Sequence, residues 1–339
     1  MRISVIKRLG ATAWFGCLAG LALIPLAVGQ TVPRSARQAK AKTSNLAFTA
    51  TGRGEYKFDT GVLRGKLRAD GKSIGLSPVV HVPSGIALSG GYGIFGHYRI
   101  FVANTRFGTA AWDWPSTARL LDDGAVEVCW PLANDRPFEM RAVYRWRDPS
   151  SLDLETVVKA QKDLPHFEVF LASYFNDAFT NSLVFVKEDP KAAGKAGFLA
   201  AKKSFGHWLM FPRDPAAVLL IKDGRWSIEP HPVDWVIMPE FGKPLGLRRD
   251  PRSGVAAVLM APPDDCFALS TPYQTEGHYS LYLSLFGKTI RAGEVARLRS
   301  RLWITQRPSD QQILDQYQTY LNELSRGRGA TTGRQILNE

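Results

Sequence analysis

The sequence predicts an all-β protein in which antiparallel strands form a sandwich or barrel, followed by one helix near the C-terminus. From Phe138 to Trp146 residues of one parity are apolar and those of the other are largely charged, and Leu152–Val158 repeats this alternation. Helical periodicity and βαβ alternation are almost absent from this region, which disfavours Rossmann and TIM folds. Between apolar runs stand hairpin-turn signals, namely Asp70-Gly71, Asp123-Gly124 and Asp223-Gly224.

The chain begins with a pattern typical of a secretory signal peptide. A basic region is followed by an apolar stretch over 9–26, and the small residues Ala27 and Gly29 suit cleavage before Gln30. We therefore expect a signal peptide over 1–29 and a periplasmic or extracellular protein. A retained N-terminal anchor is the alternative. After residue 30 no stretch approaches the roughly 20 apolar residues of a membrane-spanning helix.

The positive charge of the chain lies at its two ends. Of the formal net charge of +12, residues 1–45 carry +7 and residues 325–339 carry +2, which leaves +3 for residues 46–324. A phosphate-tracking basic face therefore has no support in the body of the chain, and we expect no nucleic-acid partner.

The domain order follows from composition and periodicity. Residues 30–45 are predicted to be a flexible basic leader, 46–308 the β domain and 325–339 a disordered tail. Between the last two, Ser309 is expected to cap a helix over 309–324 that carries an apolar stripe. Further strands are expected at 55–60, 62–68, 77–82, 98–103, 125–130, 166–175, 217–222, 255–261, 278–286 and 295–305.

Two cysteines, Cys129 and Cys266, remain after the predicted cleavage. One disulfide in an oxidising compartment and two separate buried thiols are both compatible with their spacing.

Three features carry a resemblance to a known family. The segment Phe170–Asn176 is similar to the His-Ser-Tyr-Phe-Asn segment of mutarotases, and residues 285–302 are similar to their closing turn and last strand. The run of strands over 55–305 is also similar. The sequence thus resembles the galactose mutarotase-like (aldose epimerase) superfamily. The resemblance implies a β-supersandwich whose concave sheet commonly holds a sugar.

The sequence departs from the family at both catalytic positions. The His that acts as acid is matched by Ala172, and the place nearest to the late-strand Glu base holds Ser270. The resemblance therefore implies a divergent member without the usual acid and base.

The densest candidate region for function is 93–115. Sugars are held by aromatic stacking and by planar polar groups on their hydroxyls, and Trp112, Asp113 and Trp114 supply these groups. His97 and Arg99 share a strand parity, so both are expected to point to one face. The structural alternative is that the tryptophans fill the core and Asp113 caps a turn.

Two further groups of residues are candidates. Glu276 and His278 could act as general base and acid if they face the same cavity as His97, and the alternative is a solvated loop. Tyr174 and Asn176 end a buried strand, where they could contact substrate or form a turn.

No metal-binding spacing, Gly-rich phosphate loop or serine-hydrolase elbow occurs, so we expect no metal and no cofactor. The sequence therefore predicts an exported carbohydrate-binding or carbohydrate-processing protein with epimerase-, lyase- or hydrolase-like chemistry. Proton transfer would involve His97, Arg99, Glu276 and His278. The alternative, which Ala172 and Ser270 favour, is a non-catalytic sugar-binding or envelope-interaction protein.

Overall fold

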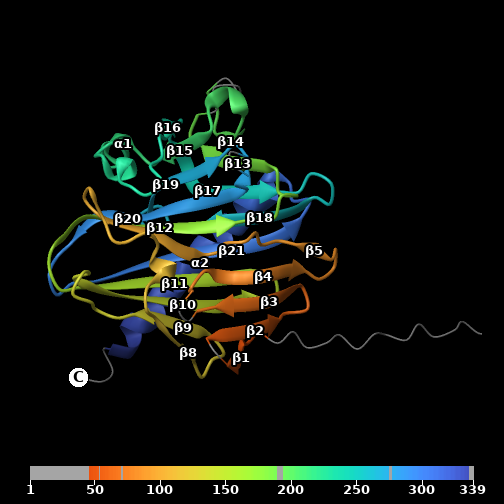
Figure 1. Cartoon of the computed structure of the whole chain (residues 1–339). Coiled ribbons are helices and arrows are strands. Elements are labelled where there is room, and N and C mark those ends of the chain that lie inside the picture. The colour runs from red at the N-terminus through yellow and green to blue at the C-terminus, as the bar shows by residue number, and fades with distance from the viewer. Residues whose placement is uncertain (1–45, 53, 70–71, 189–193, 275–276, 336–339) are drawn as a thin grey trace, which may run out of the picture. The chain divides into compact units, whose positions relative to one another are not determined.

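The computed structural model describes residues 46–52, 54–69, 72–188, 194–274 and 277–335, with side chains described as far as residue 326 (Figure 1). The predicted signal peptide, the basic leader, Glu276 and the Asp70-Gly71 turn lie outside the described residues. Within them, no helix is both long and apolar enough to cross a membrane.

The described chain forms three sheets, and every strand pairing is antiparallel except the one between β15 and β16 (Figure 1). The five-stranded sheet, in spatial order, contains β1 (Thr49–Gly52), β2 (Glu55–Asp59), β3 (Leu63–Arg68), β4 (Gly75–His81) and β5 (Ile86–Ala87). The predicted all-β antiparallel class is therefore confirmed.

The two larger sheets supply most of the domain. The nine-stranded sheet has the order β14 (Gly197–Ala200), β13 (Asn181–Val186), β17 (Phe241–Arg249), β18 (Val255–Met260), β21 (Val295–Gln306), β11 (Ser151–Ala160), β10 (Phe138–Asp148), β9 (Val126–Trp130) and β8 (Thr117–Leu120). The seven-stranded sheet has the order β16 (Val236–Ile237), β15 (Trp208–Pro212), β19 (Cys266–Pro272), β20 (Ser280–Ile290), β12 (Leu164–Tyr174), β6 (Gly96–Val102) and β7 (Thr105–Arg106).

Local sequence patterns predicted the clearest hairpins. β10 pairs with β11 from Phe138↔Ala160 to Asp148↔Ser151, and every buried residue of β10 is apolar or aromatic. β8 pairs with β9 across the expected Asp123-Gly124 turn, where Gly124 has a φ of 79°.

The prediction of a strand over 217–222 is wrong, because this segment is the helix α1 (Pro215–Ile221). Asp214 caps the helix by accepting a hydrogen bond from the Ala217 N–H at 2.8 Å, and Pro215 suits its first turn. Asp223-Gly224 is therefore not a hairpin turn but leads into the short helix η3 (Arg225–Ser227). Two other short helices occur, η1 (Ala111–Asp113) and η2 (Lys203–Phe205).

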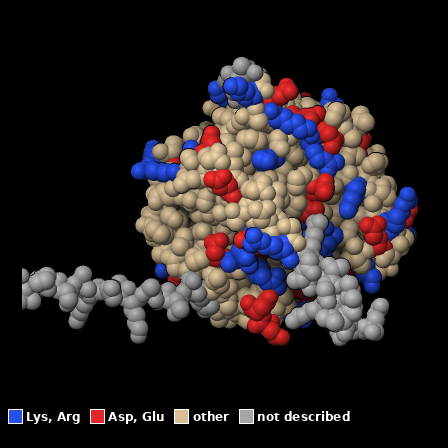
Figure 2. Space-filling model, turned by 180° about the vertical axis from the view of Figure 1, so that it is seen from behind, with Lys and Arg blue, Asp and Glu red and all other residues tan. Residues whose placement is uncertain are grey.

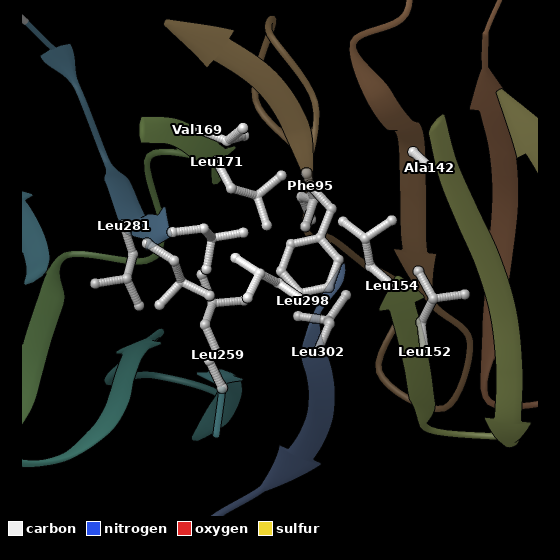
Figure 3. Packing of buried hydrophobic residues seen from close by; sticks show 14 of the residues in the cluster. Phe95, Ala142, Leu152, Leu154, Val169, Leu171, Leu259, Leu281, Leu298 and Leu302 are labelled. Atoms are coloured by element: carbon white, nitrogen blue, oxygen red, sulfur yellow. The ribbon is translucent and has the colours of Figure 1, made fainter. Parts of the chain in front are cut away.

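The inner faces of the sheets share one hydrophobic cluster (Figure 3). Leucines from several strands meet there around the ring of Phe95, which is fully buried. Burial of such side chains is the main favourable term in the stability of a domain of this kind. The labelled members of the cluster in Figure 3 are Phe95, Ala142, Leu152, Leu154, Val169, Leu171, Leu259, Leu281, Leu298 and Leu302.

The C-terminal helix α2 (Asp310–Gln335) packs against the nine-stranded sheet. Ile313, Tyr317 and Tyr320 are buried against Val258 and Leu245 in a second cluster, as the apolar stripe predicts. The helix continues past Leu324 to Gln335, so the expected disordered tail is helical up to that residue. No proline follows Leu324 to end the helix there.

The expected cap at Ser309 is confirmed as a reciprocal capping box. The Gln312 N–H donates to Ser309 Oγ at 3.2 Å, and the Ser309 N–H donates to Gln312 Oε1 at 2.8 Å. We expect Ser309→Ala to lower the free energy of unfolding by about 1 kcal/mol, because the cap satisfies an N–H that has no partner within the helix. Urea denaturation checks this, with Ser325→Ala in the body of the same helix as the control. Equal effects of the two variants would contradict the capping role.

The two cysteines are free thiols on different sheets, Cys129 on β9 and Cys266 on β19. The two thiols are therefore separate, as in the second alternative, but only Cys266 is buried, whereas Cys129 is half-buried. Basic and acidic side chains are interspersed on the face shown in Figure 2, as expected for a nearly neutral domain.

Candidate functional site

A cleft of about 470 Å³ lies on the face of the seven-stranded sheet that is turned away from the Phe95 cluster. Its polar lining residues are Arg99, Thr109, Asp113, His231 and His278. The rest of its wall is mostly aromatic, with Tyr92, Tyr98, Trp112, Phe170, Tyr174, Trp208, Trp226, Trp235 and Tyr282.

An irregularity in β6 decides which of its side chains reach this cleft. His97 pairs with Leu171 and Arg99 pairs with Phe170, so two steps along β6 correspond to one step along β12. Tyr98 is the extra residue of this bulge, and both Tyr98 and Arg99 line the cleft. The prediction that His97 and Arg99 share a face is therefore wrong, because the bulge interrupts the regular alternation.

His97 lies among the residues between the sheets and is fully buried. Its Nε2 is 3.0 Å from Thr156 Oγ1 on β11, and its ring centroid is 5.0 Å from that of Trp130. Burial lowers the pKa of His97 to about 3. The imidazole is therefore neutral at ordinary pH and does not reach the cleft.

Arg99 places a guanidinium group in the cleft wall with only 4% of the residue exposed. Nη2 donates to the carbonyl of His231 at 2.7 Å, and Cζ lies 5.2 Å and 5.3 Å from the ring centroids of Tyr98 and Trp226. Within the described residues, Nε and Nη1 have no hydrogen-bond acceptor.

Arg106 on β7 adds a second guanidinium group beside Arg99. It donates to the carbonyl of Pro230 at 2.6 Å and to that of Thr109. Burial and the positive charge of Arg99 both lower the pKa of Arg106. Two cations therefore hold the 230–231 loop through its carbonyl groups.

Tyr174 and Tyr282 present their rings to the cleft from adjacent strands. Their hydroxyl groups interact, and Ser280 Oγ donates to Tyr282 Oη at 2.6 Å. Burial raises the pKa of both phenols above the ordinary value of 10. A phenol is protonated at neutral pH even at its ordinary pKa, and burial favours this hydrogen-bond-donating form further.

The predicted Trp112–Trp114 segment is divided between cleft and core. The Trp112 ring stacks on Tyr98 with centroids 4.4 Å apart and planes at 2°, and Tyr92 lies 5.8 Å away at 18°. Asp113 is at the cleft rim, with Oδ1 3.7 Å from Lys72 Nζ. Trp114 packs in the core instead.

The surroundings of Trp114 and Asn176 match the structural alternatives considered for them. The guanidinium of Arg136 lies 4.2 Å from the Trp114 ring, which is 6% exposed. Asn176 Oδ1 accepts a hydrogen bond from the Ala178 N–H at 3.1 Å, so this side chain forms a turn. Neither residue lines the cleft.

His278 does lie in the cleft, with its ring centroid 5.7 Å from Tyr174 and 5.6 Å from Trp208. Of the four residues predicted to transfer protons, the described structure thus brings Arg99 and His278 to one cavity. Glu276 belongs to the part that is not described.

The two positions that match the family's acid and base lie in one cross-strand row. Ala172 on β12 pairs with Tyr282 on β20, and Tyr282 pairs with Ser270 on β19. The phenol of Tyr282 therefore lies between Ala172 and Ser270 at the centre of the seven-stranded sheet. Sequence reasoning missed Tyr282, although its side chain is the one aromatic ring in the apolar run 280–285.

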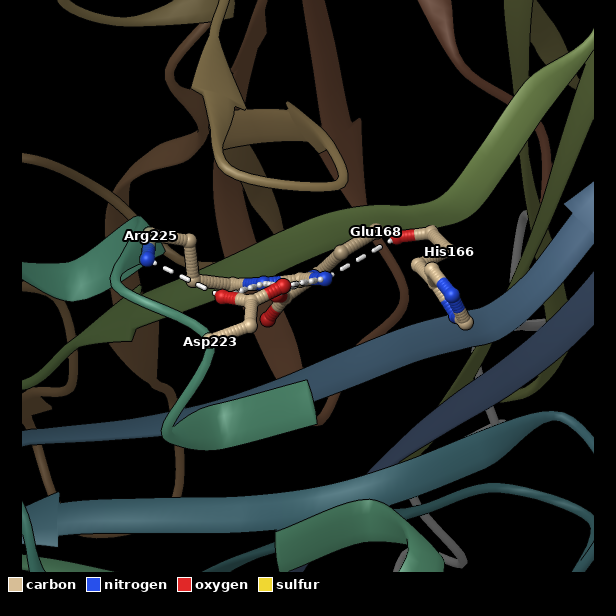
Figure 4. A network of polar contacts seen from close by, with 4 residues as sticks. All are labelled: His166, Glu168, Asp223 and Arg225. Atoms are coloured by element: carbon tan, nitrogen blue, oxygen red, sulfur yellow. Dashed lines mark hydrogen bonds and ion pairs between the residues drawn. The ribbon is translucent and has the colours of Figure 1, made fainter. Parts of the chain in front are cut away.

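A buried ion-pair network supports one wall of the cleft (Figure 4). Arg225 Nη1 donates to Glu168 Oε2 at 2.7 Å, and Nη2 donates to Asp223 Oδ2 at 2.8 Å and to the His166 carbonyl at 3.2 Å. The next residue, Trp226, packs against Phe170 with ring centroids 4.8 Å apart. The network thereby fixes a residue that lines the cleft.

Comparison with known proteins finds distant structural similarity only. No protein-family model matches the chain, and no curated protein does. Slr1438 from Synechocystis sp. PCC 6803 has 12% identity and a TM-score of 0.46, with 77% of this chain and 99% of that chain covered. A putative aldose 1-epimerase from Escherichia coli K12, of the family that the sequence resembles, has 11% identity and a TM-score of 0.43, covering 74% and 99%.

A third similar structure is the GalNAc complex of the alpha-N-acetylgalactosaminidase NagBb from Bifidobacterium bifidum. It has 15% identity and a TM-score of 0.49, with 79% of this chain and 39% of that chain covered. At such identities and TM-scores, these similarities establish neither a family nor an activity for this chain.

Proposed function

We propose that this protein binds a carbohydrate in the aromatic cleft. The observation that carries the proposal is the combination of aromatic rings with buried polar donors, namely the Arg99 guanidinium and the Tyr174 and Tyr282 hydroxyls, around one cavity. Its volume of about 470 Å³ suits a small ligand. Aromatic rings can cover the C–H faces of a sugar while the donors bind its oxygen atoms.

Binding without catalysis is the version that the residues favour. The positions that match the family's acid and base hold Ala172 and Ser270, and His97 lies outside the cleft. The second candidate is acid–base processing of the sugar. It is supported by the position of the titratable His278 beside Tyr174.

Export is part of the proposal and is supported by the sequence pattern of residues 1–29 alone. A carbohydrate ligand in the periplasm or outside the cell is the corresponding expectation.

We expect Tyr92→Ala to weaken carbohydrate binding about 3- to 10-fold, because an aromatic contact contributes about 0.5–1.5 kcal/mol. Tyr92 is 54% exposed at the cleft rim, so its removal should leave the fold intact. A glycan array identifies the ligand, and titration calorimetry then compares wild type, Tyr92→Ala and Trp112→Ala.

Leu132→Ala is the control, because this side chain is 50% exposed and does not line the cleft. It should bind as the wild type does. The absence of binding across a broad panel of neutral and acidic saccharides would refute the proposed function, as would full binding by both cleft variants.

A further inference from the structure

We propose that the ligand of this cleft carries an anionic group, which binds at Arg99. This inference rests on the proposed function for the saccharide part of the ligand. The charges and hydrogen bonds of the cleft alone point to the anionic group of the ligand.

Arg99 differs from the three arginines of the described chain that are at most 1% exposed, Arg225, Arg248 and Arg301. Arg225 pairs with Glu168 and Asp223, and Arg301 donates to Asp153 Oδ2 at 2.9 Å and to Glu323 Oε2 at 2.8 Å. Arg248 has no carboxylate partner, but Nε, Nη1 and Nη2 all donate to protein oxygens at 2.7–3.0 Å.

Among the described residues, only Arg99 of these four has guanidinium nitrogens that are buried without an acceptor. It also forms no ion pair with any described carboxylate. A buried guanidinium group with unused donors is costly, and the three other arginines avoid this cost because their donors meet protein oxygens. Arg99 is the one of the four that lines a cavity.

Arg106 lies close enough to Arg99 to increase the positive potential around it. Both guanidinium groups donate to backbone carbonyls of the 230–231 loop, and carbonyls do not neutralise their charge. The one described carboxylate that lines the cleft, Asp113, lies at the rim beside Lys72. An anion in the cleft would therefore meet the buried cation Arg99, with the half-buried Arg106 beside it, and no opposing buried carboxylate among the described residues.

The hydroxyl groups around Arg99 complete an anion-binding environment. Tyr98, Tyr174 and Tyr282 all line the same cavity, and burial raises the pKa of the last two and so disfavours their anionic forms. Carboxylate, sulfate and phosphate groups accept hydrogen bonds from guanidinium and phenol donors alike. The ligand class is therefore an acidic saccharide, which carries one of these three groups on a sugar ring.

The first experiment presents the full protein with an array of neutral, uronate-containing, sulfated and phosphorylated saccharides. We expect binding to be confined to acidic members and to weaken with rising salt. The three acidic arms identify the anionic group. For a uronate ligand, methyl esterification should abolish binding to the wild-type protein, which tests the anion without any change in the chain.

The second experiment compares variants on the saccharide that binds. Arg99→Met should reduce affinity at least 30-fold, whereas Arg99→Lys, which keeps the charge, should lose less. Arg119→Met is the control, because this exposed arginine pairs with Glu127 on the nine-stranded sheet. Its affinity should equal that of the wild type. Circular dichroism establishes that each variant is folded.

The outcomes separate the two proposals. Equal binding of neutral and acidic saccharides, or unchanged affinity of a folded Arg99→Met variant, overturns the anionic ligand and leaves the carbohydrate function standing. Binding to no saccharide at all overturns both.

Discussion

Replacing Arg225 by Met is expected to lower the free energy of unfolding by about 3–5 kcal/mol. Arg225 and Glu168 are both fully buried, and the substitution leaves the Glu168 carboxylate in the protein interior without its counter-ion. The loss should also loosen the wall that contains Trp226. Urea denaturation at neutral pH measures the change.

Two comparisons show whether this loss comes from the uncompensated charge. Arg145→Met removes an exposed pair with Asp123, so it should cost at most about 1 kcal/mol. The double variant Glu168→Gln with Arg225→Met should be more stable than Arg225→Met alone. A loss for Arg225→Met no larger than that for Arg145→Met would contradict the interpretation.

The stability of the Arg225→Met variant should also depend on pH, and the pKa of Glu168 determines the direction of this dependence. Burial raises the pKa of Glu168, and removal of Arg225 takes away the charge that opposes this shift. In the folded variant, Glu168 therefore keeps its proton up to a higher pH than it does in the unfolded chain. Its stability relative to the wild type should recover as the pH is lowered.

Acidification from pH 6 to pH 4 should destabilise the wild type by about 2–3 kcal/mol more than the variant His97→Gln. Burial lowers the pKa of His97 to about 3 in the folded protein, against an ordinary value of 6.5. The unfolded chain therefore binds more protons between these two values. The contribution of neutral His97 to the free energy of unfolding is therefore present above its ordinary pKa and is lost as the pH falls toward its pKa in the folded protein.

Urea denaturation of both proteins at several pH values measures the difference. Carboxylates other than those near His97 contribute equally to the two profiles of unfolding free energy against pH. Subtracting one profile from the other therefore isolates the contribution of His97. Glutamine can keep a hydrogen bond to Thr156, which limits the packing change. Parallel profiles for wild type and variant would show that His97 is not a neutral buried group.

The parts of the fold that were predictable from sequence depend on neighbouring residues. The β10–β11 hairpin follows from the alternation of its two strands, and the Ser309 cap needs only Gln312 three positions later. The segment 217–222 was misassigned because its five consecutive apolar residues, Ala217–Ile221, suit a strand as well as a helix. Asp214 and Pro215 were the local signals that favour the helix.

The candidate site was less predictable because its contacts join distant parts of the chain. Arg99 meets the carbonyl of a residue 132 positions later, and Arg225 meets Glu168 across 57 positions. The face of the sheet to which His97 points depends on the register between β6 and β12. The alternation within one strand does not reveal this register. Trp112 and Arg99, which lie 13 positions apart in the sequence, do line the same cleft.

The bulge at Tyr98 has an evolutionary consequence. If β6 kept Tyr98 but were regular, the alternation from His97 would turn Arg99 toward the core and Ile100 toward the cleft, so the cleft would exchange a cation for an aliphatic group. The presence or absence of this bulge can thus change the polarity of a ligand site without any substitution in the strand. Relatives that differ at this single step would be expected to select ligands of different charge.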